Sequence, residues 1–173
     1  MAQIIDVTAK TVFLHPGDGI IRRRLFHGQV DEYLPTEQPQ VSNKRADMVA
    51  RNSNGEIHHV EFQTTNEAGF GLRMLGYYYY FLCTQEKHVV QTVLYMGREP
   101  LRIETTIHTP TLEFRFEIID LREYDAETLL ASDDWADVLF ALLAKGDPEK
   151  ALTVAIARLR EMGHEERAWA LSQ

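Results

Sequence analysis

The sequence predicts a mixed α/β domain, with a central mixed sheet flanked by helices and a helical extension at the C-terminus. Segments with the alternating pattern of strands lie between residues 30 and 121, and one long apolar segment of helical length separates them. From residue 125 onward the spacing of apolar side chains is that of helices. The 173 residues, 45% of them hydrophobic, suffice for one core. We therefore expect a core over residues 1–123 and an extension over 124–173, packed on the same domain.

The first elements are a short helix and a short strand. The helix is predicted over residues 15–28, because Pro16 suits a first turn and Gly28 can end a helix. Residues 30–34 alternate as a short strand does, and the segment 35–43 is rich in turn residues.

A hairpin and a long helix follow. Two strands are predicted over residues 45–51 and 57–64. A capping box of Thr64 and Glu67 then predicts a helix over the segment 66–87. The four tyrosines of this segment favour a strand, but the segment is too long for one.

Two more strands and the C-terminal helices complete the chain. Residues 88–97 are predicted to form a buried strand, and residues 111–121 a half-exposed strand with alternating apolar side chains. Helices are predicted over 133–146 and over 147–163, where an aspartate and a proline begin the helix and a glycine ends it. A last short helix is predicted over 164–171. These amphipathic helices could close the core or form the face of a homodimer.

Charge and composition exclude several classes of function for this protein. The formal net charge of −8 argues against a protein that coats nucleic acid, but a metal site adds its own positive charge, so a nuclease stays open. The arginines at 22–24 fan around a helix, which favours a solvated face over phosphate contact. A single cysteine, Cys83, excludes an internal disulfide and a cysteine-rich zinc site. We find no signal peptide or membrane-spanning segment and expect a cytoplasmic protein without a membrane partner.

Polar side chains interrupt the predicted hairpin. Because side chains alternate along a strand, His59, Glu61 and Gln63 share one face. A three-residue turn at 53–55, with its glycine in the left-handed region, would put Asp47 directly opposite Glu61. A two-residue turn would put Asp47 opposite a sequence neighbour of Glu61 instead.

Two opposed carboxylates require a cation between them. Their Cβ atoms would lie about 5 Å apart, and without a partner the two charges would repel until one group bound a proton. Arg45 or Lys44 could supply the positive charge in a structural salt bridge. The functional alternative is a divalent metal ion, and oxygen ligands with waters suit Mg²⁺ or Mn²⁺.

Three short motifs carry a resemblance to a known family. The motifs "RAD" at 45–47, "HVEFQ" at 59–63 and "RMLGYY" at 73–78 resemble those of the Rpn-type family of recombination-promoting nucleases and transposase-like proteins. That family belongs to the PD-(D/E)XK, or restriction-endonuclease-like, superfamily. The resemblance implies a core of helix, three-strand meander, helix and strand, which is the order predicted over residues 15–97.

The resemblance also implies roles for particular residues. Asp47 matches the metal-binding aspartate and Glu61 the second acidic ligand, with the backbone carbonyl of Phe62 as a further ligand of one or two Mg²⁺ ions. Gln63 stands where most of the superfamily has a lysine that positions the attacking water. Asp18, from the first helix, is the first candidate for an additional acidic ligand.

The sequence departs from the family pattern at two positions. Gln63 carries no charge, so it can orient a water only through hydrogen bonds. Ala46 replaces the proline expected before the aspartate. Glu32 and Glu37 are weaker candidates for the additional acid.

The function implied is metal-dependent hydrolysis of phosphodiester bonds, by a DNA endonuclease of the transposase or recombination-promoting type. Arg73 and Tyr77, one helical turn apart, could face the site and contact the substrate, with Arg73 pairing with a carboxylate or a phosphate. Lys44 and Arg45 could contact the substrate as well. For the tyrosines, packing in the core is the structural alternative.

A different class of function remains open. A nuclease-like fold that no longer cuts would serve as a protein interaction module, and the acidic charge and the missing lysine are compatible with that role. Zinc chemistry is excluded more firmly. The His-x-Glu motif at His59 lacks the two later cysteines of a zinc deaminase, and His58 and His59 point to opposite faces of a strand.

Overall fold

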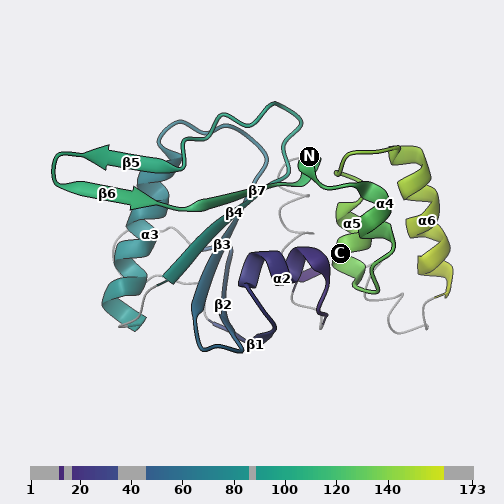
Figure 1. Ribbon diagram of the computed structural model, residues 1–173, viewed down its shortest axis with the longest axis horizontal. Helices are drawn as coiled ribbons and strands as arrows, with labels where there is room; N and C mark the ends of the chain where they lie inside the picture. Colours follow the sequence, from purple (N-terminus) through teal and green to yellow (C-terminus); the bar gives the residue numbers. More distant parts are fainter. Residues whose placement is uncertain (1–11, 14–16, 35–45, 86–88, 162–173) are drawn as a thin grey trace. The chain divides into compact units, whose positions relative to one another are not determined.

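The computed structural model describes residues 12–13, 17–34, 46–85 and 89–161 (Figure 1). The chain divides into two compact units, one of residues 25–119 and one that joins residues 1–24 to residues 120–173. The expected division into a core and an extension at residue 123 stays a prediction.

The unit of residues 25–119 is built on a five-stranded sheet with the order β1-β2-β3-β4-β7. The strands are β1 (Val30–Tyr33), β2 (Met48–Asn52), β3 (Ile57–Gln63), β4 (Val89–Tyr95) and β7 (Glu117–Asp120). β1, β2 and β3 pair antiparallel as a meander, whereas β3 and β4 pair parallel. Helix α2 (Ile20–Phe26), whose first five residues belong to the other unit, precedes the meander in the chain, and α3 (Phe70–Gln85) connects β3 to β4 (Figure 1). The predicted mixed α/β class and this order of elements are confirmed.

Strand β3 is buried along its whole length, because β2 and β4 flank it on either side. The face that carries His59, Glu61 and Gln63 meets α3, where the rings of Tyr77 and Phe81 pack against His59. Polar side chains on this face are therefore shielded from water and must find partners within the protein.

Helix α2 is shorter than predicted at both described ends. It begins at Ile20 and ends at Phe26, because His27 takes the left-handed conformation with φ 51° one residue before the expected Gly28. Asn52 fixes this end of the helix by donating its side-chain N–H to the carbonyl of Phe26 at 3.1 Å. The expected start at Pro16 lies outside the described residues.

Helix α3 begins later than predicted, so the capping box was wrong. Gly69, with φ 77°, precedes the first turn and its carbonyl accepts the N–H of Leu72 at 3.0 Å. The loop before α3 is attached to the segment after β4, because the Asn66 side chain donates a hydrogen bond to the carbonyl of Pro100 and accepts one from the N–H of Arg102. The prediction of a helix in this segment is confirmed.

The single strand predicted over 111–121 is wrong. The chain forms β6 (Leu112–Arg115), which pairs with β5 (Thr106–Thr109) in a separate two-stranded sheet, and then joins the main sheet as β7. The break falls at Phe116, whose N–H donates to the carbonyl of Thr105 at 3.1 Å. Phe116 is buried against Phe70 of α3. The alternating apolar pattern therefore reflects the burial of side chains before and after the break, and not one continuous strand.

The other unit is helical in its C-terminal part. It contains a 3₁₀ turn (Leu121–Glu123) and the helices α4 (Ala126–Leu130), α5 (Trp135–Phe140) and α6 (Pro148–Glu161). Helix α6 begins as predicted, because the Asp147 carboxylate accepts the N–H of Glu149 at 2.9 Å. Helix α5 is shorter than the predicted 133–146, and α4 was not predicted. The expected end of α6 at Gly163 and the helix over 164–171 lie outside the described residues.

Within the same unit, the N-terminus of α2 is capped by two carboxylates of α5. Asp134 accepts the N–H of Gly19 at 2.7 Å, and Asp137 accepts the N–H groups of Ile20 and Ile21 at 2.6 and 2.9 Å. Arg22 is buried beside Asp134, 3.2 Å from its carboxylate. The prediction that all three arginines form a solvated face is therefore wrong for Arg22, although Arg23 and Arg24 are exposed. None of the described helices is long and apolar enough to cross a membrane.

Candidate active site

The hairpin of β2 and β3 has the predicted three-residue turn. Met48 pairs with Val60 and Arg51 with Ile57, and the N–H of Asn52 donates to the carbonyl of Glu56 at 3.0 Å. Gly55 has φ 80°, the left-handed conformation that this turn requires. Carrying the register one pair beyond Met48 places Asp47 opposite Glu61.

Asp47 and Glu61 extend the hairpin beyond its last backbone pair. The N–H of Asp47 donates to Oε1 of Glu61 at 3.0 Å, and the N–H of Phe62 donates to Oδ2 of Asp47 at 2.9 Å. Each carboxylate thus accepts a backbone hydrogen bond from the opposite strand. Acidic residues suit this point of the strand pattern because their side chains complete hydrogen bonds that the backbone ladder no longer supplies.

The cation expected near the two carboxylates is Arg73 of α3. Its Nη2 lies 3.7 Å from Oε2 of Glu61 and donates to Oε1 of Gln63 at 3.2 Å. Its Nη1 donates to Glu67 at 2.7 Å, and its guanidinium lies over the ring of Phe70, 4.5 Å from the ring centre. The other proposed cations, Lys44 and Arg45, lie outside the described residues.

Gln63 is buried and already bound on both sides of its amide. Oε1 accepts from Arg73, and Nε2 donates to the carbonyl of Thr65 at 3.0 Å. The amide therefore lies beside Arg73 at the end of β3, on the face where the sequence placed it. A neutral amide can hold a polar group in position here, but it adds no charge.

Tyr77 lies one turn beyond Arg73 on α3, with 4% of its surface exposed. Burial, and then the negative charge of Glu61, raise the pKa of the Tyr77 phenol well above its ordinary value. The hydroxyl therefore stays protonated beside the carboxylates. Its ring packs against His59 with centroids 4.7 Å apart, so Tyr77 serves the core as well as the site.

His59 and Gln91 are site residues that the sequence did not identify. His59 Nε2 lies 3.0 Å from Oε1 of Glu61, and its Nδ1 lies 2.9 Å from the amide nitrogen of Gln91 on β4. The alternation on β3 does place His59 on the face of Glu61, so half of this contact could be anticipated. The partner on β4 could not, because it requires the register between β3 and β4.

The remaining acidic candidates have other surroundings. Asp18 belongs to the other unit and accepts two hydrogen bonds from Arg23, at 3.0 and 2.8 Å. The hydrogen bond from Arg23 lowers the pKa of this carboxyl below its ordinary value. Glu32 is exposed on β1, and Glu37 lies outside the described residues. A role for Asp18 as a metal ligand stays a prediction.

The described residues contain no group of three or more histidines, cysteines or acids placed to hold a metal ion. The ligand set predicted from the resemblance, Asp47, Glu61 and the carbonyl of Phe62, supplies two carboxylates and one backbone oxygen. Mg²⁺ typically keeps several waters and uses only one or two carboxylates together with substrate phosphates. This donor set therefore fits Mg²⁺ and does not fit a metal that needs a complete protein cage.

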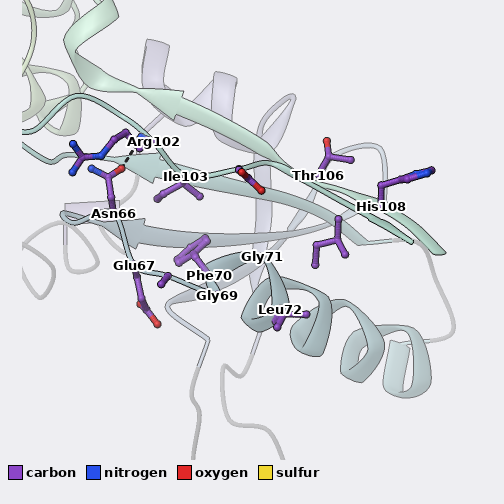
Figure 2. A pocket seen from close by; sticks show the side chains of 13 residues that line it. Asn66, Glu67, Gly69, Phe70, Gly71, Leu72, Arg102, Ile103, Thr106 and His108 are labelled. Atoms are coloured by element: carbon purple, nitrogen blue, oxygen red, sulfur yellow. Dashed lines mark hydrogen bonds between the residues drawn. The ribbon is translucent and has the colours of Figure 1, made fainter. Parts of the chain in front are cut away.

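A pocket of about 540 Å³ adjoins the cluster at the start of α3 (Figure 2). Phe70 and Leu72 line it from the helix, Ile103 lines it from the segment before β5, and Thr106 lines it from the first position of β5. The residues that connect it to the cluster are Phe70 and Glu67, since both contact Arg73. The pocket therefore lies next to the residues that hold the guanidinium of Arg73.

Comparisons with known proteins leave the family open. No family model, no curated protein and no solved structure matches the chain. The resemblance to the Rpn-type nucleases therefore stays a prediction from three short motifs. The function must be argued from the hydrogen bonds, charges and burial of the cluster around Asp47 and Glu61.

Proposed function

We propose that the unit of residues 25–119 is a restriction-endonuclease-like domain that hydrolyses phosphodiester bonds in DNA with the help of Mg²⁺ or Mn²⁺. The observation that carries the proposal is the juxtaposition of Asp47 and Glu61 at the end of the β2–β3 hairpin. Gln63 lies on the same face of β3, and Arg73 of α3 closes the group. The order of α2, the three-strand meander, α3 and β4 supports the same proposal.

Asp47, Glu61 and the carbonyl of Phe62 would hold the metal ion. When bound, the ion would lower the pKa of a coordinated water and neutralise charge on the phosphate oxygens. The backbone N–H groups that bind one oxygen of each carboxylate keep the two side chains in fixed orientations. Gln63 would orient the water by a hydrogen bond, without the charge of a lysine.

Arg73 is suited to exchange partners when metal and substrate arrive. Its contact with Glu61 is 3.7 Å long, the loosest of its polar contacts, and a metal ion on Glu61 would repel the guanidinium. Glu67 and Phe70, which both line the pocket, hold the guanidinium of Arg73 next to it. From there the planar guanidinium can donate two hydrogen bonds to a phosphate.

A second function is favoured by a specific observation. Glu61 is 3% exposed, and its carboxylate already has hydrogen bonds from Asp47 and His59 and an ion pair with Arg73. Such a carboxylate can be purely structural. In that case the domain would be a nuclease-like fold that binds a protein partner and does not cut DNA.

The deciding experiment is cleavage of supercoiled plasmid with Mg²⁺ or Mn²⁺, comparing wild type with Asp47→Ala. The matched control is Asp31→Ala, which removes an exposed carboxylate from β1 of the same sheet. We expect metal-dependent nicking by wild type and by the control, and none by Asp47→Ala. Equal nicking by all three proteins would reveal a contaminant, and no nicking by wild type would favour the interaction module.

A metal-binding measurement separates the two functions independently of substrate. Binding to the folded state alone raises thermal stability, by about 2.7 kcal/mol at a concentration one hundred times the dissociation constant. Wild type should therefore melt at a higher temperature as Mg²⁺ is added, whereas Asp47→Ala should not. A structural ion pair between Glu61 and Arg73 gives no such response.

A further inference from the structure

We propose that His59 is a positioning residue for Glu61. In this inference, which rests on the proposed metal site, His59 is anchored by Gln91 of β4 and donates its Nε2–H to one oxygen of Glu61, so that the other oxygen faces the cation. His59 would touch neither metal nor substrate. It would act by fixing the orientation of a carboxylate that does.

The position of the proton on His59 follows from the partners of Gln91. The amide nitrogen of Gln91 donates to the carbonyl of Met74 at 3.0 Å, and a carbonyl can only accept, so this atom is the nitrogen of the amide. The same nitrogen lies 2.9 Å from Nδ1 of His59, which must therefore accept. The hydrogen of the neutral ring is then on Nε2, 3.0 Å from Oε1 of Glu61.

The ring of His59 cannot easily take another orientation. It is fully buried, and the rings of Tyr77 and Phe81 lie 4.7 and 5.2 Å from it between centroids. His59 and Gln91 are direct register partners on the parallel strands β3 and β4, so their side chains stand beside each other on the same face. The donor is thus held by both the sheet and the helix.

The two oxygens of Glu61 therefore have different surroundings. Oε1 accepts from the N–H of Asp47 and from Nε2 of His59, both at 3.0 Å. Oε2 lies 3.7 Å from the guanidinium of Arg73. Two neutral N–H groups thus fix one oxygen, while the other is directed toward positive charge. Partners of this kind commonly set the affinity of a metal site through the orientation of its ligands.

The test compares variants with and without the donor. His59→Leu removes it, whereas His59→Gln keeps an amide nitrogen at about the place of Nε2. The matched control is His58→Leu, because His58 is equally buried on the opposite face of the same strand. Calorimetry should show Mg²⁺ binding weakened about 10- to 100-fold in His59→Leu, and nearly wild-type binding in His59→Gln and in the control.

Amide hydrogen exchange tests the same positioning without metal. The N–H of Asp47 donates to Glu61, so loss of the His59 donor should speed its exchange about tenfold, the effect of one hydrogen bond of ordinary strength. The N–H of Phe116, which donates to the carbonyl of Thr105 at 3.1 Å, is the internal reference. If Asp47 exchange changes as expected but wild type binds no Mg²⁺, the proposed function fails and the positioning role stands. If exchange and Mg²⁺ binding in His59→Leu both match wild type, or if His58→Leu changes them equally, the positioning role is overturned.

Discussion

Two pairs of shielded carboxylates, one in each unit, show how differently the same chemical group can be used. Asp134 and Asp137 have donors on all four of their carboxylate oxygens, which bind Gly19, Ile20, Ile21, Arg22 and Ala136. Glu61 accepts hydrogen bonds from the N–H of Asp47 and from His59 at Oε1, whereas its Oε2 has, among the described residues, only a long ion pair with Arg73. Both acids of the first pair are thus saturated by fixed donors, whereas one oxygen of Glu61 is not.

The difference has a physical origin in what each pair must satisfy. The first turn of a helix presents several N–H groups in one direction, and the two carboxylates bind those of Gly19, Ile20 and Ile21 at the start of α2. At the end of the β2–β3 hairpin both donors to Glu61 bind Oε1, so Oε2 remains directed toward Arg73. Saturation of a carboxylate by fixed donors is therefore the property that distinguishes a structural acid from a candidate ligand.

The largest expected effect is on stability, in Asp137→Asn. Both oxygens of Asp137 accept backbone N–H groups in a fully buried place, and an amide would turn one of them into a donor that faces a donor. We expect the free energy of unfolding to fall by about 3 kcal/mol in urea denaturation, since one buried N–H loses its partner and a charged acceptor is lost. The exposed Asp133→Asn serves as control. A loss below about 1 kcal/mol would contradict the structural role.

The same exchange at Glu61 should affect activity more than stability. Glu61→Gln can keep both hydrogen bonds at Oε1 and replaces only Oε2, the oxygen beside Arg73. We expect plasmid cleavage to fall at least about a hundredfold, as for loss of a metal ligand. The free energy of unfolding should change by about 1 kcal/mol or less, because Arg73 keeps its hydrogen bonds to Glu67 and Gln63 when its long contact with Glu61 is lost. A large loss of stability with unchanged cleavage would make Glu61 a structural acid like Asp137.

With a three-residue turn, the sequence predicted the opposition of Asp47 and Glu61, and it indicated that Arg73 could pair with a carboxylate there, but it did not indicate Gln91. Turn chemistry around Gly55 sets the register of a hairpin, and a local rule of this kind can be applied to a sequence directly. Arg73 and Gln91 reach Glu61, directly or through His59, only because α3 packs on one face of β3 and β4 pairs beside it. Those partners depend on tertiary packing, which residue spacing does not determine.

The sequence did not predict the capping role of Asp134 and Asp137, because their partners lie far away along the chain. Asp137 lies 116 residues from its partner Ile21, and nothing in either segment indicates the other. The capping box at Thr64 and Glu67 failed for a related reason, because Glu67 pairs with Arg73 and the loop is tied to the segment after β4. Local patterns predicted element types well, and contacts between distant segments decided where those elements begin and how their polar groups are used.

The two buried histidines of β3, His58 and His59, lie on opposite faces of the strand. The effect on stability expected for His58 is smaller than the effects predicted for Asp137 and Glu61. His58 faces away from Glu61 and accepts from the side chain of Asn52 at 3.1 Å, an amide whose oxygen is fixed by the N–H groups of Asn54 and Glu56. Burial, and then the positive charge of His27, lower the pKa of His58 below 6.5. The neighbouring Glu56 carboxylate acts in the opposite direction.

Because the unfolded chain binds a proton at His58 more readily than the folded protein, stability should fall as the pH drops from about 6.5 toward the lowered pKa. Above that window the effect is absent. Unfolding free energies measured from pH 8 to pH 5 should decline in wild type, and this part of the decline should be missing in His58→Gln. Parallel profiles for the two proteins would show that His58 does not contribute.

The smallest expected effect concerns Asp18, an acid that resembles neither pair. Its carboxylate and Arg23 form an ion pair with side-chain exposures of 43% and 65%, and solvent screens such pairs strongly. We expect Asp18→Ala to unfold within experimental error of wild type and to cleave plasmid at an unchanged rate, because Arg23 already binds both of its oxygens. Cleavage lost at unchanged stability would instead make Asp18 the additional acid of the metal site.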